Sequence, residues 1–152
     1  MAPFLGTDTY AIDDKGRIAI PPAYRGGRAS ARAAREKKPA TFVLMAGFEG
    51  CLMLHSPEGW ERLEQKLQKI SLNGRDGRAF VRAFLKDVTL VSVDGQGRIT
   101  IPPALRSRAG LGKEAVLHGI IDRIEIWDPE RFEAEIQGQQ SLEELAEAVL
   151  KD

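Results

Sequence analysis

A thirteen-residue block occurs twice in the chain and limits what the chain can fold into. Residues 13–25 read DDKGRIAIPPAYR and residues 94–106 read DGQGRITIPPALR, so nine of the thirteen positions are identical without a gap. Weaker similarity continues after each block, and there the offset falls from 81 to 72 residues, which leaves nine extra residues in the first copy between Gly26 and Thr41. Two copies are too few for a solenoid, so the chain consists of two homologous halves.

Each block has the pattern of a strand, a tight turn and a second strand. Stretches with strand composition at 10–12 and 89–93 precede the turns, and isoleucines alternate with period two after them. The Asp-x-x-Gly between them supplies a carboxylate for backbone amides and a glycine for positive φ. A Pro-Pro pair then ends the strand and favours one short helical turn.

The remaining pattern predicts more strands and several helices. Strands are expected at 42–45, 51–54, 115–117 and 123–127. Apolar residues at helical spacing predict one-sided helices from Trp60 to Ile70 and from Phe80 to Val88, packed on the sheet and separated by a break over 71–77. Ser141 and Glu144 form a capping-box pattern that opens a final Glu-rich helix.

A half of about 50 residues built from short strands buries too little surface to be stable alone. The two halves should therefore share one core as an intramolecular pseudo-dimer, in a mainly β fold with packed helices (α+β). We divide the chain into a first repeat domain at 7–57, a helical connector at 58–87, a second repeat domain at 88–129 and an acidic helix at 130–152.

Composition excludes several classes of protein. Cys51 is the only cysteine, and His55 and His118 are at non-equivalent repeat positions, so neither a disulfide framework nor a Cys/His zinc cluster is expected. Cys51 lies in an apolar strand pattern and is expected to be a core residue. No apolar run has the length of a membrane span, and a cytoplasmic protein is the default expectation. We expect no cofactor, because the sequence has no nucleotide-binding loop.

The net charge of zero conceals a split along the chain. Residues 1–110 hold 18 basic and 11 acidic side chains, whereas residues 111–152 hold 4 and 11. This asymmetry is compatible with a body that faces a polyanion and an acidic appendage. It is equally compatible with a solvated acidic helix or a subunit contact.

The repeated Asp-x-x-Gly-Arg-Ile-x-Ile-Pro, followed by an Arg four residues after the proline, resembles the AbrB-type swapped-hairpin DNA-binding fold. Two such blocks, with GFEGCL after the first and IEIW after the second, resemble the MraZ family of bacterial regulators over nearly the whole chain. The resemblance implies two AbrB-like half-barrels, ring-like homo-oligomers, and repression through short direct repeats in the promoter of the division and cell-wall gene cluster. It also implies association with the nucleoid.

The family's Asp-x-x-x-Arg element matches Asp13 to Arg17 and Asp94 to Arg98. An arginine at the tip of a two-stranded ribbon can bond guanine or grip a phosphate with its planar fork. The alternative is that each Asp–Arg pair only braces its turn. Both interpretations hold if the carboxylate orients an arginine that contacts DNA.

Four further residues complete the candidate DNA-binding set. Lys15 would neutralise phosphate, and Gln96, which replaces it in the second copy, could bond adenine or phosphate, although both could be inconsequential turn residues. Arg25 and Arg106 could extend the basic surface or contact the neighbouring half. The basic stretch from Gly26 to Lys38 could be a DNA-binding arm, but a charge run of this kind is usually a solvated loop.

Double-stranded promoter DNA and further copies of the chain are thus the expected partners, with no membrane and no small-molecule substrate. A scaffold protein that holds other proteins is an alternative. An AbrB-type antitoxin is another, although antitoxins of this type usually have one copy and an unfolded tail. An enzyme is not expected, because no nucleophile, base or metal set converges in the sequence.

Overall fold

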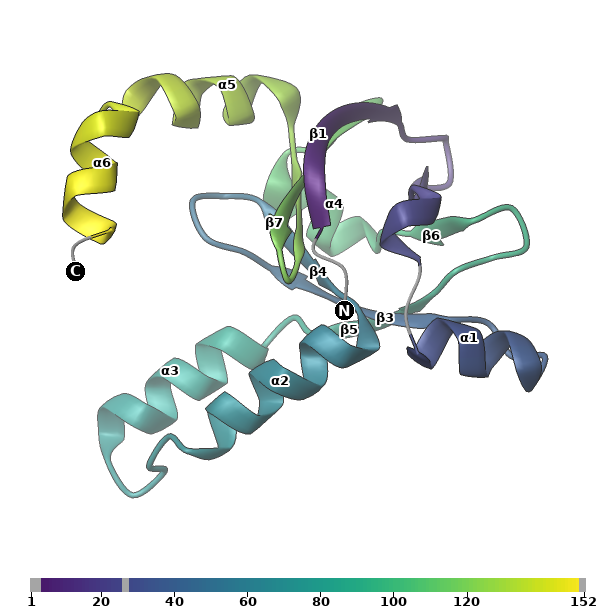
Figure 1. Cartoon of the computed structure of the whole chain (residues 1–152), viewed down its shortest axis with the longest axis horizontal. Helices are drawn as coiled ribbons and strands as arrows, with labels where there is room; N and C mark the ends of the chain where they lie inside the picture. The colour runs from purple at the N-terminus through teal and green to yellow at the C-terminus, as the bar shows by residue number, and fades with distance from the viewer. Residues whose placement is uncertain (1–3, 26–27, 151–152) are drawn as a thin grey trace.

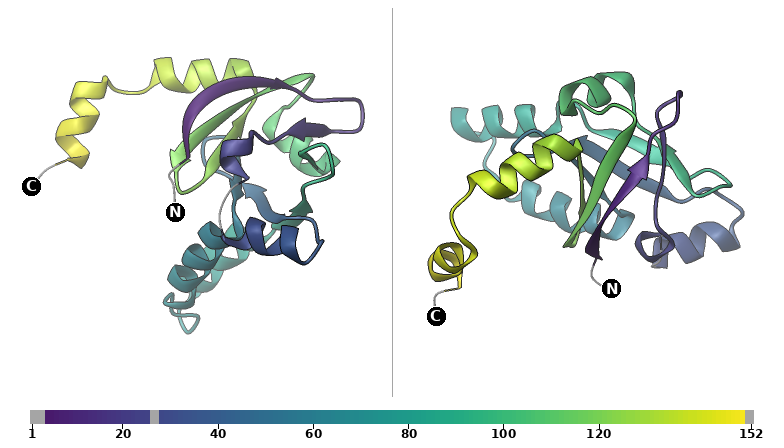
Figure 2. Two further views of the ribbon diagram at one scale, coloured as in Figure 1. Left: turned by 45° about the vertical axis from the view of Figure 1, so that its right-hand side comes forward. Right: turned by 90° about the horizontal axis from the view of Figure 1, so that it is seen from above.

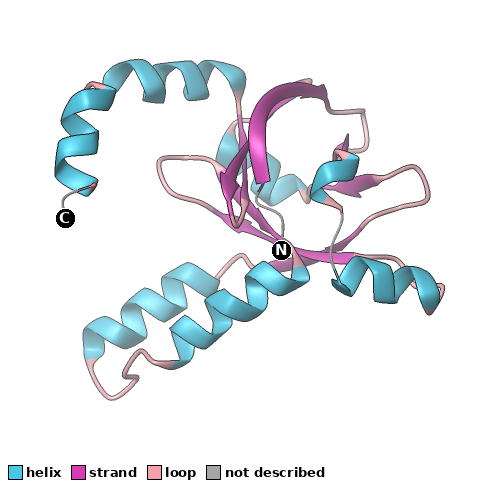
Figure 3. Ribbon diagram, in the orientation of Figure 1, coloured by secondary structure: helices cyan, strands magenta, loops and turns pink. Residues whose placement is uncertain are grey.

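The computed structural model describes residues 4–25 and 28–150. It contains an antiparallel six-stranded sheet, a separate two-stranded ribbon and helices around them (Figure 1; Figure 3). The strands are β1 (Phe4–Ala11), β2 (Arg17–Ala19), β3 (Thr41–Ala46), β4 (Leu52–His55), β5 (Thr89–Ser92), β6 (Arg98–Thr100), β7 (Glu114–Ile121) and β8 (Ile124–Trp127). The helices are η1 (Pro22–Tyr24), α1 (Arg28–Arg35), α2 (Pro57–Gln68), α3 (Arg75–Leu85), α4 (Pro103–Ala109), α5 (Pro129–Gly138) and α6 (Leu142–Val149).

The two repeats exchange strands. The large sheet has the order β1-β7-β8-β4-β3-β5, so the first strand of each repeat pairs with a strand of the other repeat. In the ribbon, β2 pairs with β6, and Ile18 lies opposite its own repeat equivalent, Ile99. In the sheet, Met53 lies opposite its equivalent, Glu125. A pseudo-twofold axis therefore passes through both pairs, which confirms the expected swapped-hairpin pseudo-dimer.

The core lies between the ribbon and the large sheet and takes residues from both repeats. The alternating isoleucines of the repeated block, Ile18 and Ile20 with Ile99 and Ile101, are each at most 1% exposed. They belong to one cluster with apolar residues of the sheet, including Phe42, Leu44, Leu52, Leu54, Leu117, Ile124 and Ile126. Because both repeats contribute to this one cluster, the apolar surfaces of the two halves leave water together, and neither half has a core of its own.

The similarity that follows each block encodes the start of a helix. Ser56 caps α2 by accepting a hydrogen bond from the Gly59 amide at 3.1 Å. Asp128, its equivalent, caps α5 by accepting from the Arg131 amide at 3.1 Å. A proline follows each cap at the first helical position, where its missing N–H costs no hydrogen bond.

Several boundaries differ from those expected. β1 and β7 are longer than the strands predicted at 10–12 and 115–117, because they pair with each other over eight residues. The predicted break over 71–77 is too long, since α3 already begins at Arg75 with Gly74 as its N-cap. No residue of α3 is buried, so this helix is not packed on the sheet as predicted.

The insertion in the first repeat also differs from a simple loop. Residues 28–35 form α1, while positions 26 and 27 are outside the described residues. At the other end of the chain, the predicted cap is confirmed, because the Ser141 hydroxyl accepts from the Glu144 amide at 3.2 Å and opens α6. Within the described ranges, no helix is long and apolar enough to cross a membrane.

Candidate nucleic-acid interface

The turn between β1 and β2 is organised by one carboxylate. Asp13 Oδ1 accepts hydrogen bonds from the backbone amides of Lys15 at 3.0 Å and Arg17 at 2.9 Å. Gly16 has φ +81°, a conformation that L side chains rarely adopt. The Asp and Gly of the motif therefore fix the path of the backbone, and this places Arg17 at the start of β2.

The turn between β5 and β6 repeats these contacts. Asp94 Oδ1 accepts from the amides of Gln96 and Arg98, both at 2.9 Å, and Gly97 has φ +79°. The two turns are thus equivalent under the pseudo-twofold axis in both hydrogen bonding and backbone conformation.

The arginines of the two turns share one carboxylate. Arg17 Nε lies 2.6 Å from Asp13 Oδ2, and Arg98 Nε lies 3.1 Å from Asp94 Oδ2. Arg98 Nη1 also lies 3.7 Å from Asp13 Oδ2, across the two repeats. The side chains of Arg17 and Arg98 remain 32% and 27% exposed, so neither guanidinium is enclosed in the core. The ribbon therefore presents two cations close together at the protein surface.

Hydrogen bonding lowers the pKa of both turn carboxylates. For Asp13 the largest cause is the bond from the Arg17 backbone amide, and for Asp94 it is the equivalent bond from Arg98. Desolvation opposes this effect as the second-largest cause, and the arginine side chains lower both pKa values by smaller amounts. Both carboxylates are consequently ionised at neutral pH and hold the guanidinium groups by charge as well as geometry.

Arg25 and Arg106 pack on the turn of the other repeat. A Cβ atom on Gly97 would come within 3.0 Å of Arg25 Cζ, and one on Gly16 within 2.7 Å of Arg106 Cζ. Arg25 Nε also donates to the Ile20 carbonyl at 2.8 Å. Of the two sequence interpretations, the structure therefore shows the contact with the neighbouring half, and it brings both side chains beside the two turns.

Lys15 and Gln96 are exposed at the outer ends of their turns, as are their neighbours Asp14 and Gly95. The two turns differ chemically at these positions, although their backbones are alike. The side chains of α1 that the structure describes lie elsewhere. Arg32 Nε bonds Glu36 Oε1 at 3.0 Å, and Lys38 Nζ lies 3.6 Å from Glu36 Oε2.

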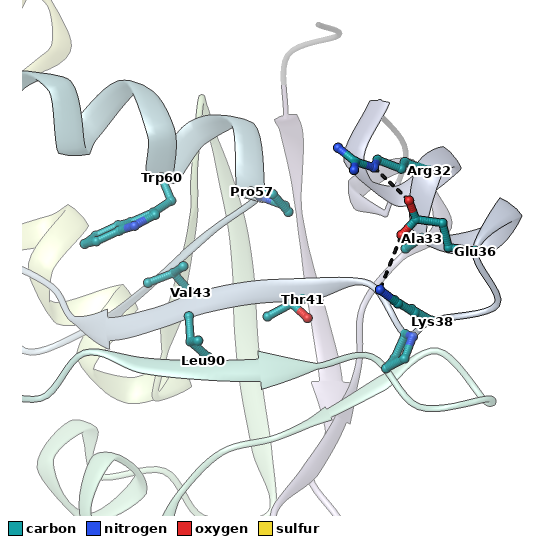
Figure 4. A pocket seen from close by; sticks show the side chains of 10 residues that line it. Arg32, Ala33, Glu36, Lys38, Thr41, Val43, Pro57, Trp60 and Leu90 are labelled. Carbon is teal, nitrogen blue, oxygen red and sulfur yellow. Dashed lines mark hydrogen bonds and ion pairs between the residues drawn. The ribbon is translucent and has the colours of Figure 1, made fainter.

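Arg32 of α1 and the following Glu36 and Lys38 border a pocket of about 350 Å³ that shares no residue with the turns (Figure 4). Its apolar side is formed by residues that include Val43, Trp60 and Leu90. Figure 4 shows the rim charges engaged with one another rather than aimed together into the pocket. This pocket therefore contains no recognisable catalytic arrangement.

The remaining reactive side chains do not form a second site. Cys51 is buried, its Sγ donates to the Phe48 carbonyl at 3.2 Å, and burial raises its pKa to about 12, which makes it a core residue as predicted. His55 is buried, whereas His118 lies 2.8 Å from the Thr7 hydroxyl through Nδ1. In the part of the chain that the structure describes, no three His, Cys, Asp or Glu side chains cluster as metal ligands.

Two features of the site go beyond the sequence predictions. One is the contact of Arg98 with Asp13, and the other is the position at which Arg25 and Arg106 meet the neighbouring half, namely the turn of the other repeat. Both depend on the exchange of strands. The identity of Arg25 with Arg106 and of Gly16 with Gly97 was the available signal, but it does not show which arginine meets which glycine.

Comparison with known proteins assigns the chain to a family. The model of the MraZ protein family, described as antitoxin-like, matches residues 3–83 and again residues 84–152. The chain belongs to the MraZ family. The two matches to the MraZ model each contain one copy of the repeated block, which agrees with a chain of two homologous halves.

Curated MraZ relatives are similar over most of their length. The chain is 38% identical to a protein of Ligilactobacillus salivarius over 97% of this chain and 96% of the relative. It is 40% identical to one of Thermomicrobium roseum over 88% and 87%, and 38% identical to one of Deinococcus radiodurans over 90% and 89%. All three are named Transcriptional regulator MraZ.

Proposed function

We propose that the chain is a sequence-specific DNA-binding transcriptional regulator without enzymatic activity. We further propose that it represses the promoter of a division and cell-wall gene cluster by binding short direct repeats. The name of its relatives supports regulation of transcription. A single structural observation supports DNA as the ligand: two equivalent turns present Arg17 and Arg98 at one surface, joined through Asp13.

The chemistry of the ribbon suits a duplex. A two-stranded ribbon can enter the major groove, where an arginine fork bonds O6 and N7 of guanine or a phosphate. Asp13 and Asp94 would hold the forks in position before binding, which reduces the side-chain entropy lost on contact. Lys15 would add a phosphate contact, and Gln96 a contact without charge. Arg25 and Arg106 would support the turns from behind and add positive potential.

One chain offers few contacts to DNA, so a single ribbon should bind weakly and with strong dependence on salt. Self-association, in ring-like assemblies as the family resemblance implies, would place several ribbons on spaced repeats. Binding of the first ribbon would then raise the effective concentration of the others. Such a regulator would act in the cytoplasm, at the nucleoid.

A titration of the purified chain against its own upstream DNA tests this proposal. Fluorescence anisotropy with a labelled duplex, a scrambled duplex of equal length and two salt concentrations should show preferential and salt-sensitive binding to the upstream duplex. Equal affinity for both duplexes would contradict sequence-specific recognition. No affinity for either duplex at moderate salt would instead favour the scaffold alternative.

A further inference from the structure

The last helix carries large apolar side chains that the described part of the chain leaves exposed. In α6, Leu142 is 82% and Val149 75% exposed, and Leu150, which follows the helix, is 76% exposed. Figures 1 and 2 show α5 leading away from the sheet, with α6 standing apart at its end. An isolated eight-residue helix is marginal in water, since most helical stability comes from packing an amphipathic face. The apolar face of α6 therefore requires a surface to cover it.

The body of the molecule offers an apolar groove between α3 and the turn that joins β3 to β4. The rings of Phe80 and Phe84 stack with centroids 5.3 Å apart, and Phe48 stacks on Phe84 at 6.3 Å. Phe48 is 55% and Phe80 45% exposed. The groove has a volume of about 250 Å³, and its other lining residues are Ala46, Gly47, Ala83 and Arg108.

The charges around α6 and the groove are of opposite sign. α6 carries Glu143, Glu144 and Glu147 and no basic residue. Residues 75–86, which contain α3, hold four basic side chains and one acidic one. At the rim of the groove, Arg108 is 54% exposed and already pairs with Asp87 at 2.6 Å. This local contrast has the same sense as the charge split between the body and the end of the whole chain.

The structure holds α6 away from the groove of its own chain. Arg131 of α5 donates through Nη1 to the carbonyls of Gly50 at 3.3 Å and Arg108 at 3.1 Å, which anchors the start of α5 near the groove. The ten residues of α5 then span about 15 Å before α6 begins. Only Gln139 and Gln140 separate α5 from the Ser141 cap of α6. In this arrangement α6 stands apart from the body and does not fill the groove of its own chain (Figure 1).

We propose that the apolar face of α6 docks into the Phe48–Phe80–Phe84 groove of a second copy of this chain. Because α6 and the groove are different surfaces, the contact is head-to-tail, and an open assembly has one free α6 at one end and one free groove at the other until it closes. The inference deepens the self-association within the proposed function by naming its two surfaces. The contact between copies requires no DNA, so the docking inference and the proposal of DNA binding can fail separately.

Sedimentation velocity of the full chain without DNA tests this contact. We compare the wild type with a helix variant, Leu142→Asp together with Val149→Asp, and with a groove variant, Phe80→Glu. Leu72→Glu is the control, since Leu72 is 57% exposed and lies outside both surfaces. The wild type and the control should sediment as assemblies, whereas the helix and groove variants should sediment as monomers. Circular dichroism of these variants should show an intact fold, with at most the loss of the eight helical residues of α6.

Mixing the two variants gives the decisive result. The helix variant retains an intact groove and the groove variant an intact α6, so an equimolar mixture should form a dimer of twice the monomer mass and nothing larger. A wild type that remains monomeric, variants that still assemble, or monomeric variants whose mixture forms no dimer would each overturn the inference. Affinity of the monomeric variants for a duplex with one repeat is measured separately and reports on the proposed function alone.

Discussion

Asp13 of the first repeat lies 3.7 Å from the guanidinium of Arg98 in the second repeat. Asp13 also pairs with Arg17 of its own turn at 2.6 Å, so it contacts both candidate DNA-binding arginines. Within the described ranges, Asp94 forms an ion pair with Arg98 alone. The two carboxylates are equivalent in the repeat but not in the number of cations they position.

This asymmetry predicts unequal effects of removing the two charges. Asp13→Asn should remove the ion-pair contact of Arg17 and one of the two contacts of Arg98, whereas Asp94→Asn should remove a contact from Arg98 alone. Loss of a nearby negative charge strengthens non-specific attraction to phosphate, whereas loss of positioning weakens recognition of bases. The ratio of affinities for the upstream and scrambled duplexes should therefore fall in both variants, several-fold more for Asp13→Asn. Equal ratios in the two variants would contradict a shared role for Asp13.

Arg17→Ala and Arg98→Ala should each weaken binding to the upstream duplex by roughly tenfold or more, the usual effect of losing a bidentate contact to a base. Arg17→Lys keeps the charge but loses the fork, and it should recover non-specific binding more than sequence preference. Arg62→Ala, an exposed arginine of α2, serves as the control. Unchanged affinity in both alanine variants, with normal circular dichroism, would remove these residues from the interface.

Lys15 and Gln96 should differ in their contribution to the salt dependence. Replacing Lys15 by Gln removes one phosphate contact, so the slope of log affinity against log salt should become shallower by about 1. Gln96→Lys should steepen the slope by a similar amount. The preference for the upstream over the scrambled duplex should change little in Lys15→Gln. The same anisotropy titration over a series of salt concentrations measures both slopes, and identical slopes in all three proteins would show that these turn positions do not touch the backbone of DNA.

The turn glycines should matter for stability rather than through any contact with DNA. Gly16→Ala introduces a Cβ 2.7 Å from Arg106 Cζ at a residue with φ +81°. We expect a loss of roughly 1–3 kcal/mol in the free energy of unfolding, as for other strained backbone positions. Gly95→Ala is a matched control, because a Cβ there has no heavy atom within 4 Å. It should change stability by about 0.5 kcal/mol or less in urea unfolding. Equal stability of both variants would contradict this account of the turn.

The repeated block allowed the turns, the isoleucine core and the pseudo-dimer to be predicted because its constraints are local. Asp13 and Gly16 define their turn within four residues, and alternation defines the buried face of β2. Contacts between repeats could not be predicted in the same way. β1 pairs with β7, and Arg106 packs against Gly16, although the residues in each contact are far apart in the sequence. Both contacts follow from strand exchange rather than from any local pattern.

The helices show the limit of periodicity. Phe80 and Phe84 have the spacing of a helix packed on a sheet, yet they stack on each other and on Phe48, and the helix buries none of its residues. An amphipathic pattern shows that a face needs cover, but it does not identify what covers it. The same pattern in α6 is fully consistent with a partner outside the chain.

His55 should make stability depend on pH between about 4 and 6.5. Burial lowers its pKa from 6.5 to about 4, the Arg123 cation contributes to the decrease, and the Asp122 carboxylate partly opposes it. Nε2 of His55 has no hydrogen-bond partner among the residues the structure describes, so no hydrogen bond at this nitrogen offsets the burial of the protonated ring. Below pH 6.5 the unfolded chain binds a proton that the folded chain excludes. The contribution of neutral His55 to the free energy of unfolding should therefore be fully present above pH 6.5. It should be lost as the pH drops towards 4, by up to about 3 kcal/mol.

Urea unfolding from pH 4.5 to 7.5, at one fixed protein concentration, measures this effect. His55→Leu should show a shallower decline in the free energy of unfolding than the wild type as the pH falls. His118→Leu removes the only other imidazole, whose Nδ1 lies 2.8 Å from the Thr7 hydroxyl, and controls for the loss of a histidine as such. Carboxylates that do not interact with His55 contribute equally to all three proteins, so the difference between the curves reports His55 together with its coupling to Asp122. Parallel curves for the wild type and His55→Leu would mean that the buried ring is not excluded from protonation.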